Sequence, residues 1–281
     1  MPATYAHWHF GKECIETMPK NLQKIIHDHR DIYDFGVHGP DILFYNLNHN
    51  EIVTYGQKMH KIPARVFFEK CKSVYHAHEE KAEMLAYIVG FVSHFTLDSV
   101  CHSYVEKKRV VENITHNKVE SEWDRHLIEL DNRKTNLVDR SESLYPNGET
   151  ARIISYFFPF SANQILQSNK KHKRIVSMLT CTSHIKYNFF KWALPKVHAD
   201  AYADLFLDFV EYEKCKDSNV RLDKLKEKAL KMYPRLLNNV LSYLNGKEEL
   251  GNYFDRLFDK NEEYDTIEIL PYEKELKYKV K

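Results

Sequence analysis

The sequence predicts an all-helical protein, and its composition and one stretch of residues support this fold class. Only 8 glycines and 9 prolines occur among 281 residues, which disfavours a fold rich in tight turns. The 18 tyrosines and 16 phenylalanines supply large apolar rings for packing helix against helix. Residues 86–106 (AYIVGFVSHFTLDSVCHSYVE) are apolar on every side of a helix. This stretch therefore predicts a buried central helix around which the other helices pack.

We expect one helical domain over residues 1–281, with three parts of different composition. The part over residues 1–132 carries the motifs, since only three of the 16 histidines follow Asn132. A polar loop then leads into a helical C-terminal part over residues 150–260. The last part, residues 261–281, is a charged tail with a short strand expected at 266–270.

Apolar residues at helical spacing predict the individual helices. We expect a break in the first helical region at Pro19 and a turn at Gly39-Pro40, because proline and glycine interrupt helices. In the helix predicted over 173–192, we expect Ile185 and Phe189 to face the core. The predicted helices lie at residues 13–28, 42–45, 51–62, 63–75, 86–106, 115–130, 151–158, 162–168, 173–192, 199–212 and 222–244.

Charge and cysteine content exclude several classes of protein. The net charge of +1 does not suit a protein that binds nucleic acid through its charge. The five cysteines are scattered and form no CxxC pair, so neither a disulfide framework nor a thiolate zinc site is indicated. The N-terminal residues lack a basic region followed by an apolar one, and the longest apolar run, 84–92, is too short to span a bilayer. We expect a cytoplasmic protein with no stable membrane insertion and no evident protein partner.

Three side chains of metal-binding type lie inside the apolar central helix: His94, Asp98 and His102. Each step of four residues turns a helix by about 40° and rises about 6 Å, so the three point to one side. The first and last are about 12 Å apart along the axis, too far to share one ion. The spacing predicts a row of ions with Asp98 able to bridge two. A histidine and aspartate four apart are more often only hydrogen-bonded, so the prediction depends on further ligands elsewhere.

The N-terminal part supplies such ligands before the central helix. His7 follows the N-terminus closely, and removal of Met1 would leave the amine of Pro2 as a ligand; the alternative is a frayed terminus. Asp41 follows the rigid Gly39-Pro40 turn, which would present its carboxylate inward; the alternative is an ordinary first-turn helix charge. His38 precedes this turn, and we expect it to lie behind the ligands rather than to bind metal itself.

Further candidate ligands come from two other predicted helices. His60 lies at the end of an apolar helix side. His116 and Glu120 are four residues apart on one helix face, which repeats the spacing of histidine and carboxylate in the central helix. Asp124 continues that face and is expected to support the ligands from behind. Nitrogen and oxygen donors without sulfur suit zinc, and fit manganese or iron less exclusively.

These residues also carry a resemblance to a known family. The chain resembles the zinc-dependent phospholipase C family, whose fold is shared with single-strand-specific nucleases of the S1/P1 type. The ordered pattern of His, GPD, His, HxxxD, His and HxxxE covers roughly the first half of the chain. The matching segments are TYAHWHFG, GVHGPDILFY, GQKMH, AYIVGFVSHFTLDSVCH and HNKVE.

The resemblance implies a multi-helix phospholipase C or P1 nuclease-like fold with up to three zinc ions among the central helices. By this resemblance Asp41, His60, His94 and Asp98 hold one zinc ion, and Asp98 bridges to a second ion. The second ion is held by His7 and the N-terminal amine of Pro2, if Met1 is removed. His102, His116 and Glu120 hold the third ion.

The implied reaction is hydrolysis of a phosphoric ester, in which a metal-bound hydroxide attacks a phosphodiester and Asp41 acts as a possible base. The expected substrate is a phospholipid head group or a nucleotide. A nuclease or nucleotidase of the single-strand type is one alternative, and it needs an aromatic surface for base stacking. A non-catalytic metal-binding helical protein is the other, although few ligands per ion leave positions open for water and substrate.

Overall fold

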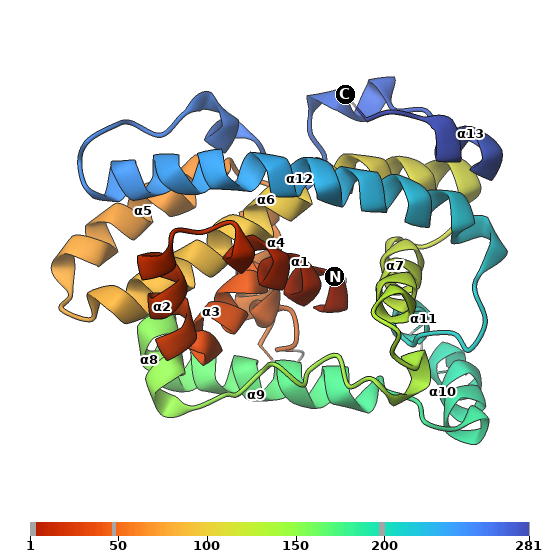
Figure 1. Ribbon diagram of the computed structural model, residues 1–281. Helices are drawn as coiled ribbons and strands as arrows, with labels where there is room; N and C mark the ends of the chain where they lie inside the picture. The colour runs from red at the N-terminus through yellow and green to blue at the C-terminus, as the bar shows by residue number, and fades with distance from the viewer. Residues whose placement is uncertain (1–3, 47–48, 197–199, 281) are drawn as a thin grey trace.

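The computed structural model describes residues 4–46, 49–196 and 200–280 and is helical, with no strand among these residues. Its centre is α6 (Lys81–Glu112), and α12 (Lys216–Leu244) runs beside α6 along one side of the molecule (Figure 1). The predicted all-helical fold class is confirmed. The strand expected at 266–270 is wrong, because Thr266 ends the short helix η5 and residues 267–270 form no strand.

The other helices surround α6. In chain order they are α1 (Thr4–Glu16), α2 (Lys20–Asp28), α3 (Arg30–Val37), η1 (Gly39–Leu43), α4 (Asn50–His60), α5 (Ala64–Ala77), α7 (His116–Leu130), η2 (Thr135–Leu137), α8 (Gly148–Ser155), α9 (Ala162–Met178), α10 (His184–Lys196), α11 (Asp200–Ala203), η3 (Glu213–Cys215), η4 (Asn252–Asp255), η5 (Glu262–Thr266) and α13 (Tyr272–Lys277).

Helix α6 is a core helix of this fold. It has the length and apolar character of a membrane span, but 94% of its most apolar 18-residue window is buried inside the protein. Aromatic residues from neighbouring helices pack around its first half; the rings of Phe67 and Phe91, for example, stack with centroids 3.7 Å apart. The helix ends at Asn113, whose left-handed backbone (φ 50°) stops further helical hydrogen bonding. The apolar side chains packed around α6 bury its polar side chains as well.

Helix α3 crosses α6 with the two backbones in contact, and this contact positions the turn that carries Asp41. A Cβ atom at Gly90 would lie 2.5 Å from the carbonyl oxygen of Tyr33, and one at Gly36 would lie 2.4 Å from that of Tyr87. Only glycine permits this approach. The chain then leaves α3 and enters η1, whose first residue, Gly39, lies against the ring of His94 on α6.

Buried ion pairs join α12 to the C-terminal residues and to α6. Glu275 is fully buried and accepts two hydrogen bonds from the guanidinium of Arg221, at 2.7 and 2.8 Å. Lys108, near the end of α6, is buried against Asp217 of α12. The main hydrophobic core joins residues from Tyr5 to Phe258. The division of the chain into parts by composition stays a prediction.

The helix predicted over residues 173–192 is wrong. A capping box of Ser161 and Gln164 starts α9, which continues through residue 173 and ends at Met178. A new helix, α10, begins at His184 after five non-helical residues. Ile185 and Phe189, expected in the core, are 84% and 58% exposed. The reason is that α10 packs its opposite side on a separate small cluster that contains Leu205 and Phe206.

Candidate metal centre

The structure brings eight of the predicted ligand side chains into one buried cluster beside α6. They come from five elements, because His7 lies on α1, Asp41 on η1, His60 on α4, and the remaining residues on α6 and α7. All are buried except His116, which is partly exposed. The eight are His7, Asp41, His60, His94, Asp98, His102, His116 and Glu120. Pro2 lies outside the described residues, so its predicted role stays a prediction.

Asp98 lies at the middle of this cluster, and each of its oxygens faces different histidines. Its Oδ1 is 3.1 Å from Nε2 of His7 and 3.6 Å from Nε2 of His102. Its Oδ2 is 3.1 Å from Nε2 of His94 and 3.9 Å from Nε2 of His60. The helical spacing of four thus places His94 and His102 on either side of Asp98. A carboxylate in this position has the geometry to join two ions.

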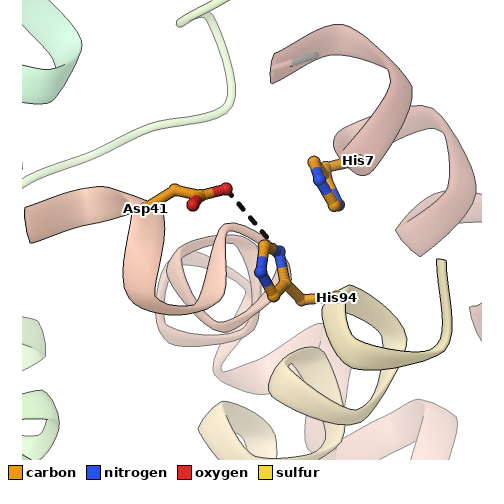
Figure 2. A group of neighbouring side chains, drawn as sticks. All are labelled: His7, Asp41 and His94. Carbon is orange, nitrogen blue, oxygen red and sulfur yellow. Dashed lines mark ion pairs between the residues drawn. The ribbon is translucent and has the colours of Figure 1, made fainter. Parts of the chain in front are cut away.

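The inner end of the cluster lies where α1, η1 and α6 meet. Figure 2 shows His7, Asp41 and His94 converging from these three elements. Oδ2 of Asp41 is 3.9 Å from Nδ1 of His94, and its Oδ1 is 3.0 Å from Nε2 of His60. The rings of His7 and His94 stack with centroids 4.4 Å apart. Two sets therefore have ligand atoms within 4.8 Å of one another: His7, Asp41 and His94, and His60, His94 and Asp98.

The outer end of the cluster lies between α6 and α7. Oε1 of Glu120 is 2.9 Å from Nε2 of His116 and 3.2 Å from Nε2 of His102. Helix α7 begins at His116 because Thr115 caps it, accepting a hydrogen bond from the backbone N–H of Lys118 at 3.1 Å. The cap fixes where the first turn starts, and the spacing of four then places His116 and Glu120 on the face toward His102.

Hydrogen bonds at Nδ1 fix the orientation of three histidine rings, so that Nε2 of each ring faces the cluster. Nδ1 of His60 donates to the carbonyl oxygen of Gly56 at 2.9 Å, and Nδ1 of His102 donates to that of Phe258 at 2.7 Å. A carbonyl oxygen only accepts hydrogen bonds, so the proton must sit on Nδ1 in both rings. Nδ1 of His116 is held likewise by the carboxylate of Glu106 at 2.6 Å. This turns Nε2 of each ring toward the carboxylates of the cluster, where it can bind a metal ion.

The sequence reasoning missed the residues that hold these rings. Glu106 is four residues after His102 on α6, and this spacing was a signal that its carboxylate shares the ligand face. The carbonyl of Phe258 had no sequence signal, because it lies 156 residues from His102 in the chain.

Several buried ligand atoms have no hydrogen-bond partner among the described residues. They include Oδ2 of Asp41, both ring nitrogens of His94, Oδ2 of Asp98 and Oε2 of Glu120. Buried polar atoms are normally paired, and a cluster of unpaired carboxylate oxygens and imidazole nitrogens facing one another indicates a place for cations. Imidazole nitrogens and carboxylate oxygens are the donors that zinc prefers when sulfur is absent. The residues of the cluster fit zinc.

The charges of the cluster determine its protonation in the metal-free protein. Burial acts to raise the pKa of Asp98, but His102, His94 and His7 outweigh it and hold the pKa well below its usual range. Burial acts to lower the pKa of His102, but the charges on Asp98 and Glu120 raise it to about 10. The carboxylates are therefore ionised at neutral pH, whereas His102 carries a proton that a metal ion must displace.

Asp124 and His38, predicted to lie behind the ligands, are both fully buried. Asp124 accepts hydrogen bonds from the backbone N–H groups of Tyr5 and Ala6, at 3.2 and 2.8 Å, and so holds the first turn of the helix that carries His7. Burial raises the pKa of Asp124, and Arg140 opposes this. His38 lies beside His172, with ring centroids 5.1 Å apart, and burial lowers its pKa well below the usual value.

A cleft of about 310 Å³ opens from the cluster to the surface. Asp41, His60, His102 and His116 form part of its wall, together with the ring-holding carboxylate of Glu106. The remaining wall residues are Phe44, Gln57, Lys61 and Asp259. A small phosphoric ester in this cleft would meet candidate ligands of both ends of the row, Asp41 and His60 as well as His102 and His116.

Comparison with known proteins agrees with this chemistry. A family model described as zinc dependent phospholipase C matches residues 6–175, which is more than half of the chain and includes every ligand candidate from His7 to Glu120. No curated protein and no solved structure matches the chain. The ordered ligands, the helical fold and the match together show that the chain belongs to the zinc-dependent phospholipase C family.

Proposed function

We propose that this zinc-dependent phosphodiesterase hydrolyses the head-group phosphodiester of phospholipids in the cleft beside His116. One observation carries the proposal: a buried row of nitrogen and oxygen donors ends at an open cleft rather than being closed on all sides. A purely structural metal site has all its positions filled by protein, whereas a catalytic site leaves room for substrate and water.

The proposed ligand sets keep the order implied by the family. Asp41, His60, His94 and Asp98 would hold one zinc ion, and Asp98 would bridge to a second ion held by His7 and the Pro2 amine. Each oxygen of Asp98 faces its own histidines, which supports the bridge. Asp41 also lies in one set with His7 and His94, so the same carboxylate could help to hold either ion.

The outer set, His102, His116 and Glu120, would hold the third zinc ion at the wall of the cleft. Zinc in such a centre supplies a Lewis acid that polarises phosphoryl oxygens and lowers the pKa of water. The protein's own contribution is to fix the ligand rings, through Gly56, Phe258 and Glu106.

Two groups of the cleft have further proposed roles. Lys61 lies on the cleft wall and offers a positive charge to an anionic phosphodiester. Burial acts to raise the pKa of Asp41, but His94 and His60 outweigh it and lower the pKa. A carboxylate with a lowered pKa is a weak base, so we assign Asp41 to metal binding ahead of proton transfer.

The test is a zinc measurement combined with a panel of phosphodiesters. Protein purified without added zinc should retain zinc, and it should hydrolyse phospholipids faster than single-stranded DNA or RNA. Faster hydrolysis of nucleic acid would favour the nuclease alternative, which needs rings for base stacking. Phe44 is the one phenyl ring among the cleft-lining residues, which favours the lipid substrate. Full zinc occupancy with no turnover on any substrate would favour the non-catalytic alternative.

A further inference from the structure

Helix α10 has a second apolar face that the protein leaves uncovered. Ile185, Phe189 and Trp192 follow at spacings of four and three, so they lie on one side of the helix. Their exposed fractions are 84%, 58% and 59%. The rings of Phe189 and Trp192 are neighbours, with centroids 6.3 Å apart. Together with Lys196 at the end of the helix, these residues are called the outer face of α10.

The opposite side of α10 is the one that packs on the protein. Tyr187, Phe190 and Leu194 pack against the small cluster that contains Leu205 and Phe206, and the rings of Phe190 and Phe206 stack at 5.1 Å. A helix that satisfied only this packing would carry polar residues on its other side. The outer face is therefore not a by-product of core packing.

Two lysines of α10 bind polar groups that lie outside its outer face. Lys191 turns toward Asp204, with Nζ 3.6 Å from Oδ1, and Lys186 donates to the carbonyl oxygen of Thr180 at 2.6 Å. Lys196 stays exposed, and its Nζ lies 3.6 Å from the centre of the Trp192 ring. Tryptophan and phenylalanine beside a terminal lysine are typical of a helix that lies in the head-group region of a membrane.

The segment that carries the outer face is joined directly to the metal centre. Thr115, which caps the helix that begins at His116, donates a hydrogen bond to Asp204 at 2.7 Å. A second surface cleft, of about 630 Å³, is lined by His116, Lys191 and Asp204 and so continues from the metal centre to α10. In Figure 1, α10 lies at the lower right of the molecule, beyond α7 and apart from α5. The family match ends at residue 175, before this helix.

We propose that the outer face of α10 docks on the surface of a phospholipid bilayer and holds the His116 side of the metal centre against the lipid. This inference rests on the proposed function, because a phospholipase must take its substrate from an aggregated lipid phase. Burial of three apolar side chains supplies the attraction, and Lys196 interacts with anionic head groups. A second copy of the chain fits less well, since three side chains on one helix fall far short of a stable interface of twenty or more residues.

The test is flotation of the zinc-loaded full chain with vesicles of phosphatidylcholine, with and without phosphatidylserine. The variant I185S/F189S/W192S removes the apolar side chains. The matched control V66S/L137S/L276S removes three exposed apolar side chains from α5, η2 and α13. We expect the wild type and the control to float, the α10 variant to bind at least about ten-fold less, and phosphatidylserine to strengthen binding of the wild type. Equal flotation of the α10 variant, or no flotation of the wild type, would overturn the proposal.

Two further measurements separate this proposal from others. Hydrolysis of a water-soluble chromogenic phosphodiester should be equal in the wild type and the α10 variant, because the outer face touches no ligand. Absence of this activity in the wild type would refute the proposed function while leaving the flotation result intact. If sedimentation velocity shows that the wild type and the control form a dimer and the α10 variant does not, the outer face binds a second copy of the chain and the membrane proposal fails. If circular dichroism shows that the triple variant is unfolded, Ile185→Ser alone should still weaken flotation several-fold.

Discussion

The two ends of the ligand row are enclosed to different degrees. At the inner end, His94 is fully buried, and the backbones of α3 and η1 lie directly against its helix. At the outer end, the side chain of His116 is 21% exposed, and its ring lies between the carboxylates of Glu106 and Glu120. The difference predicts that the inner end fixes the position of the centre, whereas the outer end is more open to the surface and to substrate.

The first prediction concerns Asp98, the one side chain that reaches both ends. Asp98→Asn removes a charge that faces His7, His94 and His102, and we expect loss of zinc together with more than about 100-fold loss of phosphodiesterase activity. Metal analysis and turnover of a soluble phosphodiester measure the two effects. Asp255→Asn, in an exposed ion pair with Arg65, is the control and should change neither. Full zinc content in Asp98→Asn would show that this carboxylate is not a bridge.

The second prediction tests the rigidity of the inner end. Gly39 has φ +50°, and a Cβ atom there would lie 2.3 Å from the ring of His94. Gly39→Ala therefore combines left-handed backbone strain with overpacking, and should lower the free energy of unfolding by about 2–5 kcal/mol. Gly148→Ala, at a glycine with open space around it, is the control and should be close to neutral. Denaturant unfolding measures both variants. A stable Gly39→Ala protein with normal zinc content would mean that the inner end is not rigid.

The third prediction tests the carboxylate that holds Nδ1 of His116 at the outer end. The hydrogen bond from His116 holds the pKa of Glu106 at about 2, so this carboxylate is charged and orients the ring. Glu106→Ala should weaken zinc binding or activity by about 10–100-fold, and Glu106→Gln should restore part of it. Zinc titration against a chelator gives the affinity. Glu112→Gln, six residues further along α6, is the control. Unchanged zinc affinity and activity in Glu106→Ala would show that Glu106 does not position the ring of His116.

The fourth prediction, with the smallest effect, concerns pH. His102 has a pKa near 6.5 when unfolded and about 10 in the folded, metal-free protein, so its protonated form stabilises the fold. This stability is complete below about pH 6.5 and is lost as the pH rises toward 10. The melting temperature of metal-free protein should therefore fall by roughly a few degrees between pH 7 and pH 9.

The same protonation predicts that zinc releases protons when it binds at pH 7.5, about one of them from His102. Calorimetry in buffers of different ionisation enthalpy counts these protons. His102→Asn is the matched variant, and its metal-free melting temperature should be less dependent on pH in this range. A melting temperature that rises from pH 7 to pH 9 in the wild type would contradict the charge assignment.

The shared side of the candidate ligands on α6 was predictable because it depends on one helix alone. The period of 3.6 residues places His94, Asp98 and His102 on one side wherever that helix lies in the fold. The same argument applies to His116 and Glu120. The outward direction of Ile185 and Phe189 was not predictable, because an apolar residue on α10 fits a covered face or an exposed one equally well. Which face is covered depends on Leu205 and Phe206, which follow in a later segment.

The amino-acid sequence by itself determined the helical fold class, the donor types and the ligand spacing along each helix, since these follow from local periodicity and side-chain chemistry. Only the tertiary structure decided which nitrogen of each histidine faces the cluster, because the acceptors that hold the rings include a carbonyl oxygen far away in the chain, that of Phe258. It also decided that Asp98 lies between His7 and His94, and that Asp124 anchors the helix of His7, since these contacts join separate helices. Contacts between distant segments depend on how whole helices pack, which local spacing does not specify.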